Sequence, residues 1–280
     1  MIFLKNFKLF LKELEHKHIY QRPSKNFRKK LVDDLSDLDR IKLESDFKIL
    51  DRDGILILPG YFQKFISDLK NEFEKLVLNF SKSVGKLAED DNKTDIGHYS
   101  INNKGLLQSH YTSKVALDEY LTRLISYYWG KSINLAQAGG TRLEPLDIKE
   151  DYRSMRWHHD TKHKQIKVFV LLTDINEYQQ CTHYVPGTHK IWKSKNDNGR
   201  RTKEFIQKYP KPVHAVGNAG TVIICDTNGY HRGNRNNTVR RDLIVFNYTA
   251  GRYTFPIDFP NNTIKNINYH WLNKSNLDIK

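Results

Sequence analysis

The chain of 280 residues is 38% hydrophobic and 12% aromatic, which is enough to bury a substantial core and excludes a wholly disordered protein. Its net charge of +14 is concentrated in residues 1–32, which carry +7, and residues 190–215, which carry +6; such segments attract an anionic partner or simply keep a protein soluble. The two cysteines, Cys181 and Cys225, exclude a disulfide-rich scaffold, and no apolar run reaches the roughly 20 residues of a transmembrane helix, so we expect a cytoplasmic protein.

The N-terminal segment is basic and predicted to be helical. Residues 1–15 place an apolar stripe on one helical face, made of Phe3, Phe7, Phe10 and Leu14. Such a helix either packs on its own domain or makes a peripheral contact with a membrane surface, and the sequence leaves both open. Residues 20–48 are polar and weakly periodic, so residues 1–50 are assigned to a basic helical extension.

The next segments alternate between helix and loop. Residues 53–62, DGILILPGYF, predict a short buried strand and a turn at Pro59-Gly60. An amphipathic helix follows, with its apolar face made of Phe62, Phe65, Ile66, Leu69, Phe73, Leu76 and Val77. Residues 82–112 are predicted to be loops, and a second helix covers about 114–129.

Beyond residue 133 the pattern becomes that of short strands separated by turns. The strand-like runs are INLAQAGG, IKVFVLLTD, THYVPGTH, GTVIICDT and DLIVFNYTAG. This pattern favours a β-barrel or jelly roll over βαβ units, so the fold class is mainly β with helical additions. We assign residues 51–270 to this domain and residues 271–280 to a C-terminal tail, and the sequence does not indicate an oligomeric state.

Metal-ligating side chains are concentrated in WHHDTKH, residues 157–163. Because side chains alternate along a strand, His158 and Asp160 share one face and His159 points to the other. His231, in DTNGYHRGN, offers a third ligand after another buried strand. Two histidines and one carboxylate leave three octahedral positions open, as in non-haem Fe(II) oxygenases. Zinc on the same histidines is the alternative, although no thiolate lies in these motifs.

Two arginines follow His231 at the start of the predicted strand DLIVFNY, namely Arg240 and Arg241. An arginine that faces into the barrel could pair in a bidentate manner with the carboxylate of a cosubstrate that chelates the metal through its other end. Adjacent residues of a strand point to opposite faces, so only one of the two can have this role.

The chain resembles the phytanoyl-CoA dioxygenase (PhyH) family of Fe(II)/2-oxoglutarate-dependent oxygenases. The resemblance lies in the order and spacing of five motifs: HHDT, KVFVLLTDIN, YVPGTHK, DTNGYHRGN and RRDLIVFNY. The resemblance runs from DGILILPGYF to about residue 250. It implies a cupin-like, double-stranded β-helix core, which is also called a jelly roll, with N-terminal helices packed on one side.

The resemblance also implies roles for individual residues. His158, Asp160 and His231 look like the iron ligands. Arg241 looks like the residue that binds the distal carboxylate of 2-oxoglutarate, because family members place an aromatic residue seven positions later, here Tyr248; Arg240 is the alternative.

The implied activity is that of a dioxygenase that converts 2-oxoglutarate and O₂ to succinate and CO₂ while it oxidises a small molecule, with ascorbate as a candidate reductant. Halogenating relatives carry a small residue in place of the acid, so Asp160 favours hydroxylation. Two departures concern the cosubstrate pocket: Gly233 stands where many relatives have serine, and YQQCTHYVPGTHK lacks the Asn-Gly usual there. The alternative is a non-catalytic jelly-roll module that holds an anionic partner on its basic surface.

The basic segment 190–215 suggests a class of substrate. By the resemblance it borders the mouth of the active site, where its charge would suit a CoA thioester, a nucleotide-sugar, a lipid head group or another anionic metabolite. The candidate anion-binding residues are Lys193, Lys195, Arg200 and Arg201, and the candidate pocket residues are Tyr152, Arg153, Trp157 and Trp192. Nucleic acid is not expected, because no aromatic and basic platform is interleaved in the chain.

Overall fold

A computed structural model describes residues 23–84, 98–101, 106–107, 109–145, 153–160, 165–191, 193, 199–236, 238–250, 257–258, 269–272 and 277–278. The predicted helical stripe of residues 1–15 lies outside the described residues. None of the helices in the described part combines the length and the apolar character that crossing a membrane requires.

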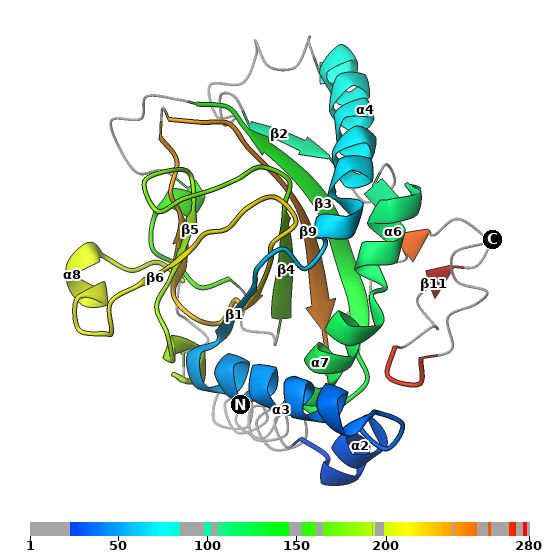
Figure 1. The fold of residues 1–280 in the computed structure, drawn as a ribbon. Helices are drawn as coiled ribbons and strands as arrows, with labels where there is room; N and C mark the ends of the chain where they lie inside the picture. The colour runs from blue at the N-terminus through cyan, green and yellow to red at the C-terminus, as the bar shows by residue number, and fades with distance from the viewer. Residues whose placement is uncertain are drawn as a thin grey trace, which may run out of the picture.

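All the described helices except α8 lie in the first half of the chain (Figure 1). They are α2 (Lys25–Lys30), α3 (Asp37–Asp53), α4 (Ile66–Val84), α6 (His110–Ala116), α7 (Glu119–Trp129) and α8 (Lys203–Ile206), with 3₁₀ turns η1 (Gln63–Phe65), η2 (Arg153–Met155) and η3 (Thr188–Lys190). The single helix predicted over about 114–129 is wrong, because the chain forms α6 and α7 instead. The side chain of Asp118 accepts a hydrogen bond from the Leu121 amide at 2.9 Å, and this cap starts a new helix.

Two antiparallel sheets form the core, as the jelly-roll prediction requires. The larger sheet has the order β1 (Ile55–Leu58), β7 (Val222–Asp226), β4 (Gln165–Leu171), β9 (Arg241–Thr249), β3 (Asn134–Leu143) and β2 (His98–Ile101). The smaller sheet has the order β6 (Val213–Ala215), β5 (Thr182–Tyr184) and β8 (His231–Gly233). A separate parallel pair joins β10 (Ile257–Asp258) to β11 (Leu277–Asp278). The mainly β prediction with a double-stranded β-helix core is therefore confirmed.

The prediction of loops over residues 82–112 is wrong at β2, which pairs antiparallel with β3. Its sequence, HYSI, alternates polar and apolar residues over only four positions, which is too short a pattern to predict a strand. An edge strand has a neighbour on one side only, so pairing rather than a hydrophobic pattern defines it.

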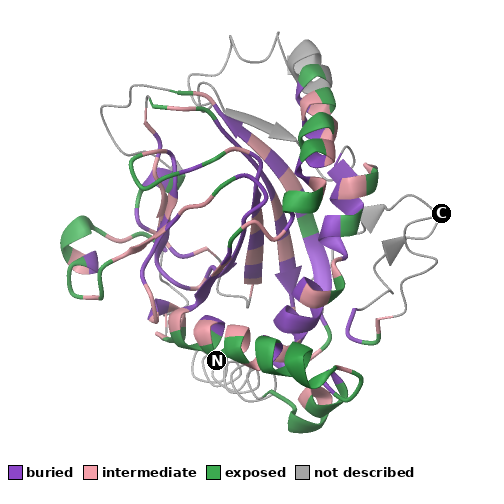
Figure 2. Ribbon diagram, viewed as in Figure 1, coloured by how far each residue is buried: buried purple, intermediate pink, exposed green. Residues whose placement is uncertain are grey.

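The larger sheet separates two kinds of environment. Even-numbered residues of β4 and β9 pack against α3, α4, α6 and α7 in the main hydrophobic cluster; examples are Val168, Ile244 and Phe246, each 0% exposed. Odd-numbered residues face the smaller sheet, where Leu171 packs with Tyr184. Figure 2 shows the resulting alternation of buried and partly buried positions along the strands. The helices therefore cover one face of the sheet and leave the other for the site.

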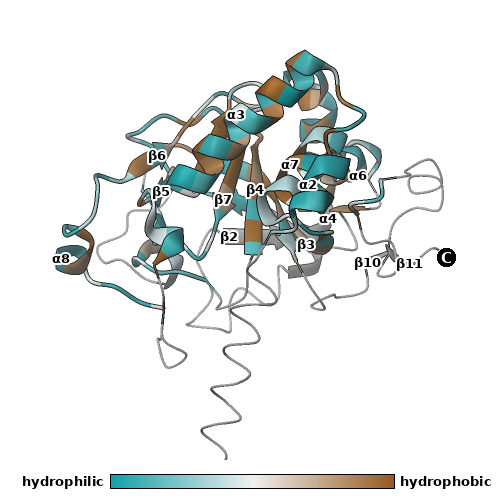
Figure 3. Ribbon diagram, turned by 90° about the horizontal axis from the view of Figure 1, so that it is seen from below, coloured by the Kyte–Doolittle hydropathy of each residue, from teal (hydrophilic) through white to brown (hydrophobic). Residues whose placement is uncertain are grey.

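Helix α3 crosses the boundary predicted at residue 50. Its Leu43 and Leu50 are fully buried in the main cluster, whereas Leu38 and Ile41 are exposed. Figure 3 shows the resulting mixture of hydrophilic and hydrophobic residues along the helix. The division of the chain at residue 50 remains a prediction, and α3 contributes to the same core as the strands.

Truncation of Phe246 to alanine should lower the free energy of unfolding by about 3–5 kcal/mol, because it empties a fully buried site between the sheet and the helices. Urea unfolding would measure the loss. Tyr178→Ala serves as the control, since Tyr178 is 77% exposed and its replacement should change stability by about 0.5 kcal/mol or less. A similar loss in both variants would contradict the assignment of the core.

Candidate active site

The backbones of His158 and His231 are hydrogen-bonded neighbours. The His158 amide donates to the His231 carbonyl at 2.9 Å, and the His231 amide donates back at 2.7 Å. The segment around His158 thereby extends the smaller sheet beyond β8. The predicted regular strand through HHD is wrong, since only isolated bridges at His158 are present, but the pairing still fixes where the side chain points.

Three potential ligand atoms converge beside this bridge. Asp160 Oδ1 lies 3.6 Å from the Nε2 atom of His158 and 3.6 Å from that of His231. The ligand atoms of all three residues lie within 4.8 Å of one another. His159 is directed elsewhere: it is buried, with its ring 6.1 Å from that of Tyr230.

Backbone carbonyls fix the tautomers of the two histidines. His158 Nδ1 lies 2.7 Å from the Arg156 carbonyl and His231 Nδ1 lies 2.9 Å from the Gly229 carbonyl. A carbonyl oxygen can only accept, so each Nδ1 carries the proton and each Nε2 keeps a lone pair toward Asp160. Burial, followed by the neighbouring His231, lowers the pKa of His158 to about 4, so this imidazole is neutral at pH 7. Two imidazoles that can bind through Nε2 and one carboxylate are a donor set that suits Fe(II).

Asp160 is held in its ionised form. Burial by itself opposes ionisation, but the ammonium group of Lys167 beside the carboxylate acts in the opposite direction, and the pKa of the carboxyl group is lowered. Lys167 Nζ lies 2.5 Å from Asp160 Oδ2, the oxygen that does not face the histidines.

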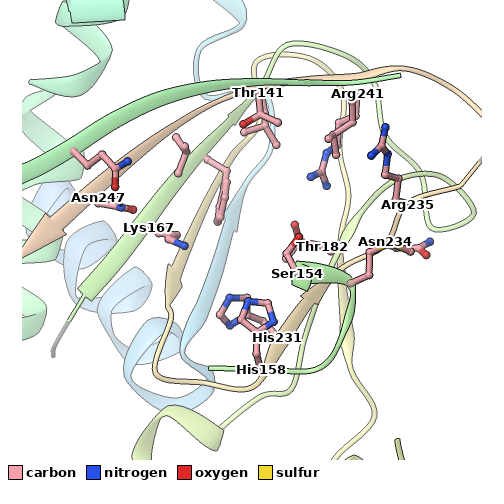
Figure 4. Close-up of a pocket in the computed structure, with 17 residues that line it drawn as sticks. Thr141, Ser154, His158, Lys167, Thr182, His231, Asn234, Arg235, Arg241 and Asn247 are labelled. Carbon is pink, nitrogen blue, oxygen red and sulfur yellow. Dashed lines mark hydrogen bonds between the residues drawn. The ribbon is translucent and has the colours of Figure 1, made fainter. Parts of the chain in front are cut away.

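A cavity of about 280 Å³ lies next to the three residues and between the two sheets (Figure 4). Its wall contains His158, His231, Lys167, Arg235 and Arg241 together with several neutral polar side chains. The cationic side chains of this wall, Lys167, Arg235 and Arg241, therefore face a space that has room for a small anionic molecule.

Arg241 is one of two buried arginines in the wall of this cavity, and Arg235 is the other. Arg241 is 8% exposed, and its guanidinium donates to the Gln180 carbonyl. Among the described residues its Nε has no hydrogen-bond partner and the side chain makes no ion pair with a carboxylate. Burial lowers the pKa of Arg241 to about 10, which leaves the group charged at pH 7. A buried charge of this kind is stabilised by an anion placed in the cavity.

The sequence matches the model of the phytanoyl-CoA dioxygenase (PhyH) family over residues 50–241. The chain belongs to the phytanoyl-CoA dioxygenase family. This confirms the resemblance drawn from the motifs, and an oxygenase-type function follows from the membership. No curated protein matches the sequence.

Several solved structures share the fold. The 2-oxoglutarate-dependent epimerase SnoN from nogalamycin biosynthesis has 19% identity and a TM-score of 0.59, covering 75% of this chain and 84% of its own. EctD from S. alaskensis has 21% identity and a TM-score of 0.58, covering 74% and 76%. HygX from Streptomyces hygroscopicus, solved with nickel and 2-oxoglutarate, has 17% identity and a TM-score of 0.54, covering 77% and 90%. At these identities the likeness establishes the fold alone.

Arg240, the alternative to Arg241, points away from the cavity. Its side chain is 44% exposed and forms ion pairs with Glu74 and Asp242. It is absent from the residues that line the cavity among those described. The geometry thus favours Arg241 as the candidate for a buried carboxylate.

Gly233, which stands where many relatives have serine, lies in the wall of the cavity. It pairs directly with Thr182 of β5, which lines the cavity too. A Cβ at position 233 would lie 3.8 Å from the Ser154 carbonyl oxygen, an ordinary contact, so there is space for the serine that many relatives carry. Thr182 provides a hydroxyl group on the facing strand.

The four predicted substrate residues whose side chains are described do not line the cavity. Trp157 is buried in a cluster with Val185, Ile206 and Tyr230. The side chains of Lys193 and Arg201 pack over the ring of Tyr230, at 4.9 and 5.0 Å from its centre. Arg200 is exposed, and its backbone forms a bridge with His158. Arg153 begins η2, and its side chain is not described; Tyr152, Trp192 and Lys195 lie outside the described residues.

Several cavity residues were missed from the sequence. They are Gln137, Thr141, Leu143, Ser154, Met155, Lys167, Phe169, Thr182, Asn234, Arg235, Leu243, Val245 and Asn247. The alternation of β4 and β9 carried a usable signal: Lys167 shares a face with Phe169, and Asn247 shares a face with Arg241. A lysine in the apolar run IKVFVLL is the residue that this pattern marks as unusual.

A second group of possible ligands, Cys181, His183 and His214, lies on the smaller sheet. The two imidazole rings are stacked at 4.2 Å with an angle of 8°, which directs their lone pairs in parallel rather than toward one point. Arg232 also donates to His183 Nδ1 at 3.3 Å. This arrangement suits histidines that pack against each other better than a metal site.

His183 should make the metal-free protein sensitive to acid. Burial, followed by Arg232 and His214, lowers the pKa of His183 to about 4, whereas an unfolded histidine titrates near about 6.5. The unfolded state therefore binds the extra proton first, and stability that is complete above about pH 6.5 is lost as pH falls toward 4, by up to about 3 kcal/mol. Urea unfolding at pH 7 and pH 4.5 should show a smaller acid loss in His183→Gln than in the wild type. Equal losses would contradict this assignment.

Proposed function

We propose that the chain is an Fe(II)/2-oxoglutarate-dependent dioxygenase that hydroxylates a small anionic metabolite. The observation that carries the proposal is the convergence of two histidine Nε2 atoms and one carboxylate oxygen at the wall of a cavity that also holds the buried Arg241. The structures of SnoN with Fe³⁺ and 2-oxoglutarate and of HygX with nickel and 2-oxoglutarate support the choice of cofactor and cosubstrate.

His158, Asp160 and His231 would hold the iron, and Arg241 would bind the distal carboxylate of 2-oxoglutarate through its guanidinium. When bound, the iron would couple the oxidative decarboxylation of 2-oxoglutarate by O₂ to oxidation of the substrate, with release of succinate and CO₂. The carbonyls of Arg156 and Gly229 keep both imidazoles in the required tautomer. Phe169, Leu243 and Val245 line the cavity with apolar surface and limit water around the reacting groups.

An anionic substrate is supported by the charge of the cavity wall. Arg235 and Arg241 line the same space, and 2-oxoglutarate offers only one carboxylate to the end away from the metal ligands. Asp160 provides the carboxylate of a hydroxylase donor set. Other outcomes occur on this fold, since SnoN is an epimerase and SnoK a carbocyclase, so product analysis must decide between them.

The proposal is tested by anaerobic titration with Fe(II) and then 2-oxoglutarate. A weak visible charge-transfer band of the chelate is expected, together with slow succinate formation once O₂ and ascorbate are admitted. A folded, metal-loaded protein without the band would favour the alternative, a jelly-roll module that binds an anion without catalysis.

Reversal of the charge at Arg200 should raise the KM for an anionic substrate while leaving the affinity for 2-oxoglutarate unchanged. Arg200 is exposed and adjoins His158 through the backbone bridge, so its charge lies near the metal ligands. Arg200→Glu would be compared with Lys203→Glu, an exposed lysine on α8. An exposed charge changes such a KM by about tenfold or less and loses its effect in high salt. An unchanged KM would remove this segment from substrate binding.

A further inference from the structure

The two oxygens of the Asp160 carboxylate face different partners. Oδ1 faces the histidines, 3.6 Å from both Nε2 atoms. Oδ2 faces Lys167, whose Nζ lies at 2.5 Å. Only one oxygen of the carboxylate is therefore directed to the point where the imidazole lone pairs meet.

Lys167 is held firmly in this place by the sheet. It belongs to β4, which has β7 on one side and β9 on the other, and its direct neighbours are Cys225 and Asn247. The flanking residues Ile166 and Val168 are both 0% exposed in the core, so the strand cannot turn to release the side chain. The Lys167 side chain is 23% exposed and lines the cavity.

A lysine in the middle of a central strand is costly unless a carboxylate compensates its charge. Asp160 supplies that carboxylate, although it comes from a segment that precedes β4 and belongs to the other sheet through the His158 bridge. The ion pair thus connects the larger sheet to the candidate metal ligands.

We propose that Lys167 is a positioning residue that restricts Asp160 to binding the metal through one oxygen. This proposal rests on the proposed function. It adds that Lys167 determines how many coordination positions of the metal remain free. Three ligand atoms leave three of six octahedral positions open, two for 2-oxoglutarate and one more. If Asp160 used both oxygens, the third open position would be lost.

The test uses the full-length protein loaded with Co²⁺ without oxygen, since the visible spectrum of Co²⁺ reports the number of ligands. The variants are Lys167→Met, which removes the charge but keeps the length, and Lys167→Arg, which keeps the charge. Lys190→Met is the matched control, because Lys190 forms a 3.0 Å ion pair with Asp51 on the surface. Affinities for Co²⁺ and for 2-oxoglutarate are measured for each protein.

We expect Lys167→Met to change the Co²⁺ spectrum before any 2-oxoglutarate is added and to weaken 2-oxoglutarate binding by about 10- to 100-fold, the range known for residues that orient metal ligands. Affinity for Co²⁺ should stay the same or rise, Lys167→Arg should restore the wild-type spectrum, and Lys190→Met should match the wild type.

An unchanged Co²⁺ spectrum in a folded Lys167→Met variant would overturn the proposal, even if the affinity for 2-oxoglutarate fell. A parallel loss of Co²⁺ binding and of thermal stability would also overturn it, since Lys167 would then be structural only. Absence of the metal and 2-oxoglutarate signals from the wild type would instead refute the proposed function.

Discussion

Replacement of Asp160 by alanine should abolish the Fe(II)/2-oxoglutarate chelate and the turnover that depends on it. The variant loses the only carboxylate of the candidate ligand set and leaves Lys167 as an unpaired cation beside the metal position. Loss of a residue that merely orients a ligand costs about 10- to 100-fold in metal affinity, so loss of the ligand itself should exceed about 100-fold. Anaerobic Fe(II) titration, followed by the visible band, measures both effects.

The control for Asp160 is Asp242→Asn, a change at another buried carboxylate. Asp242 pairs with Arg142 at 2.7 Å and does not line the cavity among the described residues. This variant should lose stability but bind iron as the wild type does. If Asp160→Ala still forms the band with wild-type affinity, the assignment of Asp160 as a ligand is wrong.

Replacement of Arg241 by alanine should weaken 2-oxoglutarate binding by about 30- to 4,000-fold, with little change in metal affinity. Truncation of one partner in a buried charge pair costs about 2–5 kcal/mol, and each 1.4 kcal/mol is about tenfold. The effect should lie in binding of the cosubstrate, because Arg241 lines the cavity and belongs to neither the metal ligands nor their hydrogen-bond partners. Titration of the iron-loaded variant with 2-oxoglutarate gives the dissociation constant directly.

Arg240→Ala provides the neighbouring control for Arg241. Its guanidinium lies at the surface in ion pairs with Glu74 and Asp242, so 2-oxoglutarate affinity should change by about threefold or less. If Arg240→Ala weakens the binding of 2-oxoglutarate more than Arg241→Ala does, Arg240 and not Arg241 is the residue that binds the cosubstrate.

The strands that the sequence made visible are those with a buried apolar face. β1, β3, β4, β7 and β9 were all predicted from apolar runs, because they form the middle of the larger sheet or pair with its middle. The three-residue strands β6 and β8 and the polar edge strand β2 were not predicted, since long-range pairing rather than local pattern defines them.

The residues of the candidate site could be predicted from the sequence only in part. His158, Asp160 and His231 stood out because their residue types suit one ion and their motifs adjoin buried strands, the first two before β4 and the third after β7. Lys167 and Arg235 did not, because a single cation has no partner that can be identified from sequence spacing. Residues 190–215 were predicted to border the mouth of the active site. Lys193 and Arg201 of this segment pack over Tyr230 and do not line the cavity, and a role of the segment in substrate binding stays a prediction.

The backbone bridge between His158 and His231 also bears on how the protein folds. The two residues are more than 70 positions apart, and strands β4 to β7 lie between them in the chain. Contacts of such high sequence separation carry the entropic cost of closing a long loop, which slows folding. We therefore expect the ligand set to be assembled late in folding, and the rate at which a refolding chain gains metal affinity would measure this step.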